Sequence, residues 1–481
     1  MYKNVHSDEI WVNVFGSTRQ NQQNSESEVF FKQIDIGKNP FEVFAKLSEN
    51  FTNLYILESA IGPEKLAEYS FIGFDPRLKI KLINNQIQIN QKKNISKFEI
   101  SDNKFIFHEL KNILIENSTT NNFNRLVGGL VGFISYDIIR YWENIAEKYT
   151  SMKFPDFEFG LYDEGIIFDH RNHKTYYYYT EKNRISDIKK ILKNDHNNDL
   201  VSFTNPESNI SKEAFENNVD ITKEYVKNGD IFQAVLSKKY EFKIYGNLIN
   251  VYKELRKLNP SPYMYYYKSD DLNIIGASPE MLVRITGQRI ETFPIAGTRP
   301  RLNNQIKNSQ LTKELLADEK ENAEHVMLVD LARNDVGQIA QYGTVKVPDF
   351  RQVHQFSHVQ HIVSKVIGEI RPNLDAFDAI KAIFPAGTVS GAPKVRAMEI
   401  IQELEGDSRG PYAGALGYFS KNMSADFAIA IRTLVVKGND AYIQAGAGIV
   451  ADSIPEREWN ETEQKASALI SALNVAGGIK K

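Results

Sequence analysis

The 481-residue sequence has no cysteine, no long apolar run and no excess of basic residues. Without cysteine, disulfide bonds, thiolate metal ligands and a cysteine nucleophile are excluded. No apolar stretch approaches the roughly 18 residues that cross a bilayer, and residues 1–30 show no signal peptide, so we expect a cytoplasmic protein that binds no membrane. Because 58 Lys and Arg face 61 Asp and Glu, there is no basic field for nucleic acid, and a small-molecule partner is favoured.

The chain is long enough for a large core and divides at the polar stretch "NPESNISKEAF". Residues 29–175 alternate short strand-like runs, such as "LKIKLINNQIQI" and "KTYYYYT", with polar connections and the turn-rich "RLVGGLVGFISYD". Residues 206–474 mix helices and strands without a regular βαβ alternation, which favours the α+β class. In this second region we expect helices at 211–229 (with Ser211 as N-cap), 248–258, 311–334, 393–405 and from 455 onward, and strands at 233–244, 412–420, 427–437 and 441–450.

Two predicted helices each carry a pair of glutamates on one face. In "DEKENAEHVMLVDLARND", Glu321 and Glu324 are three residues apart, and in "PEREWNETEQKASALI" Glu458 and Glu461 repeat the pair with Lys465 one turn further on. A single acidic helix face is usually just solvated. Two such faces meeting across a cleft would need a cation, and Mg²⁺ suits carboxylate oxygens. Zn²⁺ is disfavoured, since cysteine is absent and only one histidine lies beside these pairs.

Two loops are suited to an anion. The "FPAGTVSGAPK" loop precedes a predicted helix whose N-terminus could bind a carboxylate. The stretch "QAGAGIVAD" has the glycine spacing of a dinucleotide-binding loop, but Pro455 interrupts any immediate helix and no acidic residue follows at the required distance. Its glycines would still let backbone N–H groups approach an oxyanion, and Arg432 could clamp it. His361 is a candidate acid or base; the alternative is a buried core histidine.

These segments together resemble the chorismate-utilising enzymes and, among them, the anthranilate synthase component I branch. The resemblance covers most of the chain and is strongest from 211 to 470, through "GDIFQAVLSK", "GASPEMLV", "PIAGTRPR", "DEKENAEHVMLVDLARND", "FPAGTVSGAPK", "GPYAGALGY" and "AGAGIVADSIPEREWNETEQKA", all in family order. It implies an α+β fold in which two large antiparallel sheets pack as a sandwich, with helices outside and the active site between.

The resemblance also implies roles for individual residues. Glu324 and Glu461 would bind Mg²⁺, with Glu321 and Glu458 in support. His361 would act in acid–base chemistry, and Glu280 would be the acid near the departing hydroxyl. The substrate chorismate would be held by Gly297, Thr298, Thr388, Tyr412, Arg432, Gly446, Gly448 and Lys465.

Two positions distinguish the branches of this family. Its water-using members carry a lysine at the position of Gln233, and aminodeoxychorismate synthases typically carry a nucleophilic lysine at the position of Ala296. Their replacement here implies attack of ammonia at C2 of chorismate, loss of the C4 hydroxyl and elimination of pyruvate to give anthranilate. Aminodeoxychorismate synthase component I remains the alternative enzyme. A catalytically silent binding subunit is disfavoured, because all four glutamates and His361 are present.

Two further implications concern partners. Because the chain has no cysteine, ammonia derived from glutamine would have to come from a separate glutamine amidotransferase subunit. Two stretches resemble the tryptophan feedback site of the branch; the alternative is an ordinary strand edge and a Pro-rich turn. In that site Glu58 would accept from the ligand ammonium, and Tyr263 and Met264 would enclose the indole. The predicted regulatory residues are Leu57, Glu58, Ser59, Asn259, Pro262, Tyr263 and Met264.

Overall fold

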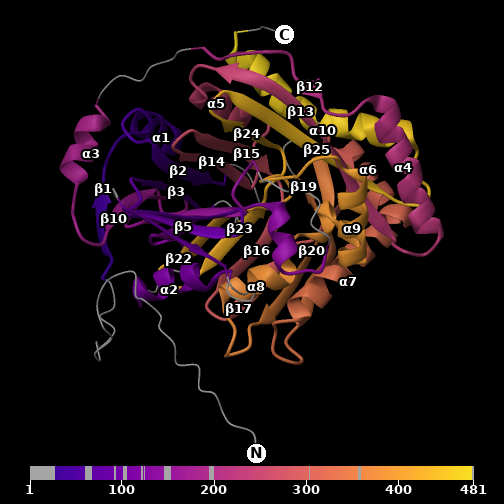
Figure 1. Ribbon diagram of the computed structural model, residues 1–481, viewed down its shortest axis with the longest axis horizontal. Helices are drawn as coiled ribbons and strands as arrows, with labels where there is room; N and C mark the ends of the chain where they lie inside the picture. The colour runs from indigo at the N-terminus through magenta and orange to yellow at the C-terminus, as the bar shows by residue number, and fades with distance from the viewer. Residues whose placement is uncertain are drawn as a thin grey trace, which may run out of the picture.

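The computed structural model describes residues 28–478 except 60–67, 92–93, 101–105, 121–122, 124, 146–152, 194–199, 303 and 356–358. The first residues, where we expected no targeting segment, lie outside this range. Within it the chain forms two large sheets, of 13 and 12 strands, with every strand pair antiparallel. The predicted α+β class with two large antiparallel sheets is confirmed (Figure 1).

The first sheet combines strands from both predicted regions. β2 from the N-terminal region pairs with β14 from the C-terminal region, so the boundary near residue 205 does not separate two sheets. In spatial order its strands are β1 (Phe30–Ile34), β10 (Lys174–Tyr179), β9 (Glu164–Asp169), β3 (Tyr69–Phe74), β2 (Asn53–Glu58), β14 (Tyr263–Ser269), β15 (Leu272–Ser278), β24 (Thr433–Lys437), β25 (Asp440–Ile449), β13 (Gln233–Tyr245) and β11 (Ser202–Phe203), while β12 (Glu207–Ser208) and β21 (Gly391–Ala392) also pair with β13.

The second sheet is mixed in origin in the same way, because β22 pairs with β7. The order is β18 (Ile295–Pro300), β20 (Val359–Glu369), β17 (Arg289–Thr292), β16 (Met281–Thr286), β23 (Ala425–Ile429), β22 (Ala415–Ser420), β7 (Gly129–Ile134), β8 (Phe157–Tyr162), β4 (Leu78–Ile83), β5 (Gln86–Gln91) and β6 (Asn94–Glu99), with β19 (Lys346–Gln355) paired to β20.

An aromatic layer fills the space between the sheets. Tyr55 of the first sheet packs edge-on against Tyr162 of the second, with ring centroids 4.7 Å apart, and both side chains are buried. Phe133 of β7 and Tyr267 of β14 meet in the same layer. Burying such large rings contributes several kcal/mol of hydrophobic stabilisation, roughly 1.5–3 kcal/mol for each side chain, and holds the two sheets as one sandwich.

Helices cover the outer faces of the sandwich (Figure 1). α1, α5 and α10 pack on the first sheet, α2, α7 and α8 pack on the second, and α4 and α9 cover β13 and β25. The helices are α1 (Pro40–Ser48), α2 (His108–Glu116), α3 (Ile185–Ile191), α4 (Lys212–Lys227), α5 (Ile249–Leu258), α6 (Gln305–Ala317), α7 (Glu319–Gly337), α8 (Ala376–Ile383), α9 (Lys394–Leu404) and α10 (Pro455–Ala476), with short 3₁₀ turns η2 (Tyr136–Tyr141) and η3 (Gly387–Val389).

Two predicted elements were wrong in a way that matters for the site. The helix expected at 311–334 is two helices, because the Asp318 side chain accepts hydrogen bonds from the N–H groups of Lys320 and Glu321 and so begins α7 anew. The strand expected at 427–437 is also two strands. β23 lies in the second sheet and β24 in the first, and the chain crosses between them at Arg432, whose φ is +51°.

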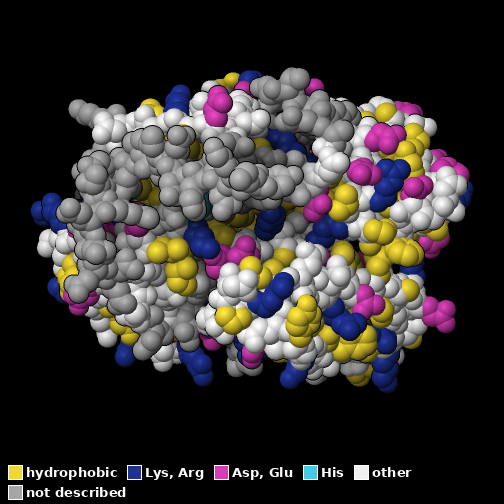
Figure 2. Space-filling view, turned by 60° about the horizontal axis from the view of Figure 1, so that its bottom comes forward, with side chains coloured by type: hydrophobic (Ala, Val, Ile, Leu, Met, Phe, Trp, Pro, Cys, Tyr) yellow, Lys and Arg dark blue, Asp and Glu magenta, His cyan; other side chains and the backbone are white. Residues whose placement is uncertain are grey.

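Other predicted elements were confirmed. Ser211 caps α4 by accepting from the N–H of Ala214, and the strands at 233–244 and 441–450 pair as β13 and β25. The stretch before residue 137, by contrast, was read only as turn-rich, and it contains a fully buried strand, β7. Within the described ranges, no helix has both the length and the apolar content needed to cross a bilayer. On the face drawn in Figure 2, acidic and basic side chains are interspersed rather than gathered by sign.

Candidate active site

The candidate active site lies where the chain crosses twice between the two sheets. Glu280 lies on the connection from β15 to β16, and Arg432 on the connection from β23 to β24. The two connections are joined by hydrogen bonds, from the N–H of Ile429 to the carbonyl of Glu280 (3.1 Å) and from the N–H of Ala277 to the carbonyl of Arg432 (3.2 Å). A left-handed φ at a non-glycine residue is strained and persists only where the surroundings fix it, and at Arg432 it lies at the crossing between the two sheets.

Glu280 is a buried carboxyl group whose acid form persists at neutral pH. Its side chain is buried, and this loss of solvent raises its pKa to about 8. The hydroxyl of Thr388 donates to Glu280 Oε1 at 2.9 Å and, with the positive charges of Lys465 and Arg432, opposes this rise in pKa. A carboxyl group with a pKa near neutrality, surrounded by cations, is suited to proton transfer.

Lys465 links α10 to the glycine-rich strand β25. Its Nζ donates to the carbonyl of Gly446 at 2.8 Å and pairs with Glu461 at 2.7 Å. A Cβ added to Gly446 would lie 2.8 Å from the hydroxyl of Tyr412, and one added to Gly448 would lie 2.3 Å from Nε2 of Gln233. At Gly446 a Cβ would also lie 2.8 Å from the backbone oxygen of Leu236, so this position requires glycine, whereas at Gly448 the Gln233 side chain would have to move. The structure thus brings together Tyr412, Gly446, Gly448 and Lys465, four residues predicted to hold the substrate.

Gln233 begins β13 with its amide buried. Only 3% of its surface is exposed, and its Oε1 is a buried atom with no hydrogen-bond partner among the described residues. An unpaired buried acceptor costs about 1–3 kcal/mol, so such an atom marks a place where a ligand can donate to it.

His361 lies on β20 beside the predicted substrate residues of β18. Its Nδ1 is 2.9 Å from the carbonyl oxygen of Gly297 and 3.1 Å from Oγ1 of Thr298. Because a carbonyl only accepts, Nδ1 carries the ring proton and Nε2 carries the lone pair. Burial, together with the charge of Arg432, lowers the pKa of His361, so the imidazole is neutral at pH 7. By contrast, His325 bonds Ser364 in the core with its pKa lowered to about 4 by burial.

The two predicted glutamate pairs, on α7 and α10, lie close enough for their charges to act on one another. Burial raises the pKa of Glu324, and the negative charges of Glu321 and Glu461 raise it further. The pKa of Glu458 is raised by burial and by the charge of Glu461. Lys320 of α7 also forms an exposed ion pair, at 3.1 Å, with Asp452 just before α10.

Positively charged side chains of the protein already form ion pairs with two of these carboxylates, Glu321 and Glu461. Arg299 Nη1 pairs with Glu321 at 3.1 Å and its Nη2 with Asp318 at 2.8 Å, while Lys465 pairs with Glu461. Within the described ranges, no three acidic or histidine side chains already lie at the spacing of a metal site. The donor set itself, four carboxylates from two helices, suits a hard cation such as Mg²⁺, which would compete with Arg299 and Lys465 for it.

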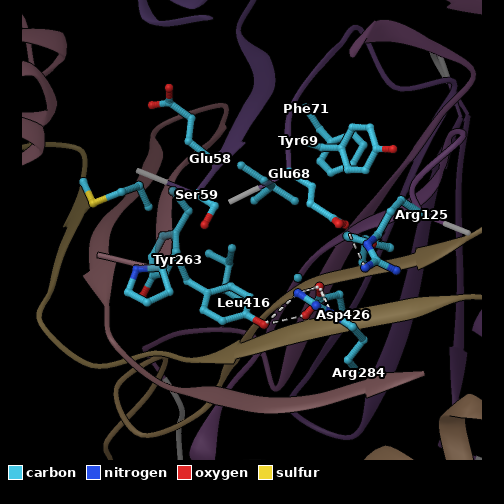
Figure 3. A pocket seen from close by; sticks show the side chains of 16 residues that line it. Glu58, Ser59, Glu68, Tyr69, Phe71, Arg125, Tyr263, Arg284, Leu416 and Asp426 are labelled. Carbon is cyan, nitrogen blue, oxygen red and sulfur yellow. Dashed lines mark hydrogen bonds and ion pairs between the residues drawn. The ribbon is translucent and has the colours of Figure 1, made fainter. Parts of the chain in front are cut away.

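A second cavity brings together predicted regulatory residues from the two halves of the chain. It encloses about 560 Å³, including its open mouth, and five of these residues besides Glu58 line it. They converge because β2 pairs with β14 in a register that sets Met264 opposite Glu58. Figure 3 shows Ser59 and Tyr263 on one side of this cavity and Tyr69, Phe71 and Arg125 on the other. The five are Leu57, Ser59, Pro262, Tyr263 and Met264.

The carboxylate of Glu58, predicted to accept from a ligand ammonium, already has partners within the protein. It accepts from the hydroxyl of Tyr252 at 2.7 Å and pairs with Arg256 at 2.8 Å, and it points away from Ser59 and Tyr263 (Figure 3). The acidic residues Glu68 and Asp426 line the cavity as well. Asn259 ends α5 and is not among the lining residues.

Sequence reasoning missed several residues of these sites. No role was predicted for Arg299, which directly follows Thr298. Its positive charge, close in the sequence to the acidic start of α7, was a signal that could have been used. Asp426 and Arg284, which pair at 2.7 Å in the wall of the second cavity, lie on neighbouring strands β23 and β16. Their convergence depends on strand order, which no local pattern in the sequence reveals.

The fold and this constellation define a class of protein. A family model described as chorismate binding enzyme matches residues 52–471, and the chain belongs to this family.

Curated relatives that match nearly the whole chain are named anthranilate synthase component 1. Anthranilate synthase component 1 of Methanothermobacter marburgensis is 45% identical over 466 residues, covering 97% of this chain and 98% of the relative. The protein of the same name from Aquifex aeolicus is 44% identical over 457 residues, covering 91% and 92%. The crystal structure of anthranilate synthase component I from Streptococcus pneumoniae is 37% identical, with a TM-score of 0.73 over 84% of this chain and 92% of that one. A menaquinone-specific isochorismate synthase from Escherichia coli shares the fold, with a TM-score of 0.70 at 18% identity over 93% of this chain and 95% of that one.

Proposed function

We propose that the protein is the chorismate-converting component of an anthranilate synthase, a carbon–oxygen lyase that opens tryptophan biosynthesis. Chorismate and ammonia would give anthranilate, pyruvate and water. The observation that carries this proposal is the neutral amide of Gln233 beside Gly448, whose buried oxygen has no hydrogen-bond partner in the part of the chain that the structure describes; a water-activating enzyme of the family would carry a lysine at this position. Ammonia is a nucleophile in its own right and needs no such base. The identity to relatives named anthranilate synthase component 1 supports the same choice.

The reaction would use residues from the two connections between the sheets, β15 to β16 and β23 to β24, and from the glycine-rich strand β25. Arg432, Tyr412 and the backbone N–H groups around Gly446 and Gly448 would hold the enolpyruvyl carboxylate. Ammonia would attack C2, and both ring double bonds would shift, from C1=C2 to C1=C6 and from C5=C6 to C4=C5, as the bond from C4 to its hydroxyl breaks. Glu280, protonated at neutral pH, would give that hydroxyl its proton so that it departs as water.

Elimination of the side chain then completes the aromatic ring. The C2 hydrogen would leave as a proton, and the bond from the ring to the enolpyruvyl oxygen would break to release pyruvate. His361 would handle protons in this acid–base chemistry, because its Nδ1–H is fixed on Gly297 and its Nε2 has the lone pair. Thr298 and Lys465 would complete the pocket around the substrate.

Magnesium would be bound between α7 and α10. Glu324 and Glu461 would hold it, with Glu321 and Glu458 in support, and the bound cation would neutralise a carboxylate of chorismate. The mutual repulsion that raises the pKa of Glu324 would be relieved by the cation, so Mg²⁺ and chorismate should bind cooperatively.

Two partners follow from the same proposal. A separate glutamine amidotransferase subunit would supply ammonia, because this chain has no cysteine to form the thioester intermediate. L-Tryptophan would bind the cavity beside Ser59 and inhibit. Its indole would lie near Tyr263 and Met264. The carboxylates near the cavity each have an arginine partner, Arg256 for Glu58, Arg125 for Glu68 and Arg284 for Asp426, so the ligand ammonium would compete with one of these arginines.

The proposal is tested by incubating the purified chain with chorismate, Mg²⁺ and an ammonium salt at raised pH. Equal amounts of anthranilate and pyruvate, detected by fluorescence and by a lactate dehydrogenase assay, are expected. Formation of 4-amino-4-deoxychorismate without pyruvate would instead assign the protein to the folate pathway, against the inference drawn from Ala296.

A further inference from the structure

A fully buried lysine of β13 contacts α10, one of the two helices that carry a glutamate pair. The side chain of Lys238 has an exposed fraction of 0%. Its ammonium lies over the ring of Trp459 and pairs with the Glu463 carboxylate at 2.5 Å, and both of these residues belong to α10. The hydroxyl of Tyr240, two residues further along β13, donates to the same carboxylate oxygen at 2.5 Å. The roles assigned above in binding chorismate, magnesium and tryptophan include none of these four residues.

Aromatic rings surround this buried charge. Trp459 meets Phe215 of α4 edge-on, with ring centroids 5.7 Å apart, and the Lys238 ammonium lies 5.1 Å from the ring centroid of Tyr240. Burial lowers the pKa of Lys238, and its contact with Glu463 opposes this fall. Taking an ammonium out of water is costly, so its place in the core depends on the carboxylate and on the rings that face it. These contacts join α4, β13 and α10 at one point.

Only one face of β13 takes part in these contacts. Successive side chains of a strand point to opposite faces, so Lys238 and Tyr240 share the face toward α10. On the other face Ser237 donates to Glu405, whose carboxylate pairs with Arg409 at 2.6 Å. The place of Lys238 beside α10 is thus set by the alternation of the strand.

The contacts to Trp459 and Glu463 fix the rotation of α10 about its own axis. Each residue of an α-helix advances by about 100°, so Glu458, Glu461 and Lys465 lie within about 60° of one another on one face. By the same count Trp459 and Glu463 lie on the opposite face, centred about 150° away. A helix held on this second face cannot rotate without moving the two glutamates of the first face relative to α7.

We propose that Lys238 is a positioning residue for the magnesium site. Its ammonium holds Trp459 and Glu463, and so fixes the rotation at which Glu458 and Glu461 face the glutamates of α7. Lys238 would act through α10 and would touch neither the cation nor the substrate. The inference rests on the proposed function, because it concerns the magnesium site placed there between α7 and α10.

The experiment measures the binding of Mg²⁺ and Mn²⁺ to the full-length chain without chorismate, by isothermal titration calorimetry and, for Mn²⁺, by electron paramagnetic resonance. Lys238→Met keeps the length of the side chain and removes its charge. Lys421→Met is the matched control, because the Lys421 side chain is 1% exposed and pairs with Asp163 at 2.5 Å, at the turn between β22 and β23 of the second sheet. Glu461→Gln is the reference for a lost metal ligand.

Two further variants separate positioning from other effects of the substitution. The double variant Lys238→Met/Glu463→Gln leaves no unpaired charge, so a loss of affinity that came only from an unpaired carboxylate would be restored in it. Tyr240→Phe removes the other donor to Glu463, and is used if Lys238→Met does not fold.

A metal-free measurement reports the placement of α10 directly. Because the chain has no cysteine, spin labels can be attached at Val326→Cys of α7 and Gln464→Cys of α10, which are both exposed. The distribution of distances between the two labels should broaden in Lys238→Met and stay as narrow as in the parent in Lys421→Met.

The parent and Lys421→Met should bind the cations equally. Lys238→Met should bind them about 10- to 100-fold more weakly, as is typical when a residue that supports metal ligands is removed, and the double variant should remain weak. Tyr240→Phe should show a smaller loss in the same direction. The inference is overturned if Lys238→Met binds as tightly as the parent, if the double variant regains the parental affinity, or if the distances between the labels do not change. A loss in Glu461→Gln alone would leave the proposed magnesium site in place without Lys238, whereas parental affinity in Glu461→Gln, or a parent that binds neither cation, would remove the site and the inference together.

Discussion

The hydroxyl of Thr388 sets the pH range in which Glu280 can act as an acid. It donates to Glu280 Oε1 at 2.9 Å and so favours the ionised carboxylate, against the burial that raises the pKa of Glu280 to about 8. With that pKa, about nine-tenths of Glu280 is protonated at pH 7 and about one-tenth at pH 9. A rate that depends on protonated Glu280 should therefore fall about tenfold across this range.

The substitution Thr388→Val removes the hydroxyl and keeps the shape of the side chain. A hydrogen bond to a charged group is worth about 1.5–3 kcal/mol, and one pKa unit corresponds to about 1.4 kcal/mol, so the pKa of Glu280 should rise by at most about one to two units. The direction of this change in the pKa of Glu280 is definite. Because the carboxylate loses a donor, the acid form persists to higher pH, and the alkaline limb of the activity profile should move upward even if the maximal rate falls.

The assay is the initial rate of anthranilate formation between pH 6 and about 10. Total ammonium is adjusted at each pH to keep the concentration of free ammonia constant. Otherwise the rise of free ammonia with pH would mask the decline in activity on the alkaline side. Thr298→Val is the matched control, because its hydroxyl lies 3.1 Å from His361 and the same substitution should leave the alkaline limb in place. If the alkaline decline in activity stays at the same pH, or moves to lower pH, in Thr388→Val, the assignment of Glu280 as the acid would be refuted.

Four further outcomes follow from the contacts described above. Glu324→Gln and Glu461→Gln should abolish turnover without changing the circular dichroism spectrum or melting cooperativity; near-normal rates at low micromolar Mg²⁺ would contradict the metal assignment. The purified chain should form anthranilate from ammonium but not from glutamine until an amidotransferase subunit is added, and glutamine use by the chain alone would contradict the import of ammonia. Ser59→Phe should keep ammonia-dependent activity and lose tryptophan sensitivity, which in the parent should amount to a coupling of about 1–3 kcal/mol, or roughly a 5- to 150-fold change in chorismate affinity; an unchanged inhibition constant would remove the regulatory site from this cavity. Arg409→Met should lower the free energy of unfolding by about 3–5 kcal/mol in urea titrations, because it strands the buried carboxylate of Glu405; a loss below about 1 kcal/mol would show that solvent reaches this ion pair.

Features with a local pattern could be predicted from the sequence. The cap at Ser211 and the glutamate pairs on α7 and α10 follow from spacing within one helix, and that spacing survives in the structure. The close approach at Gly446 and Gly448 was signalled by glycines in a strand. These features depend on residues a few positions apart, where propensity and periodicity are informative.

Other features depend on strand order and could not be predicted in the same way. The apolar run through β23 and β24 continues across Arg432, so the sequence gives no sign that the chain changes sheets there. The pairing of Glu58 with Arg256 also unites distant segments, and only the tertiary structure shows that this carboxylate is already engaged in an ion pair.

The position at which nitrogen enters the ring tests the central claim most directly. Chorismate is incubated with the purified chain, Mg²⁺ and ¹⁵N-labelled ammonium, and the products are identified by mass spectrometry and ¹⁵N-edited NMR. The account predicts one labelled aminobenzoate with nitrogen ortho to the carboxylate, released with an equal amount of pyruvate. A product labelled at C4, an unlabelled isochorismate, or no ring-labelled product at all would contradict it.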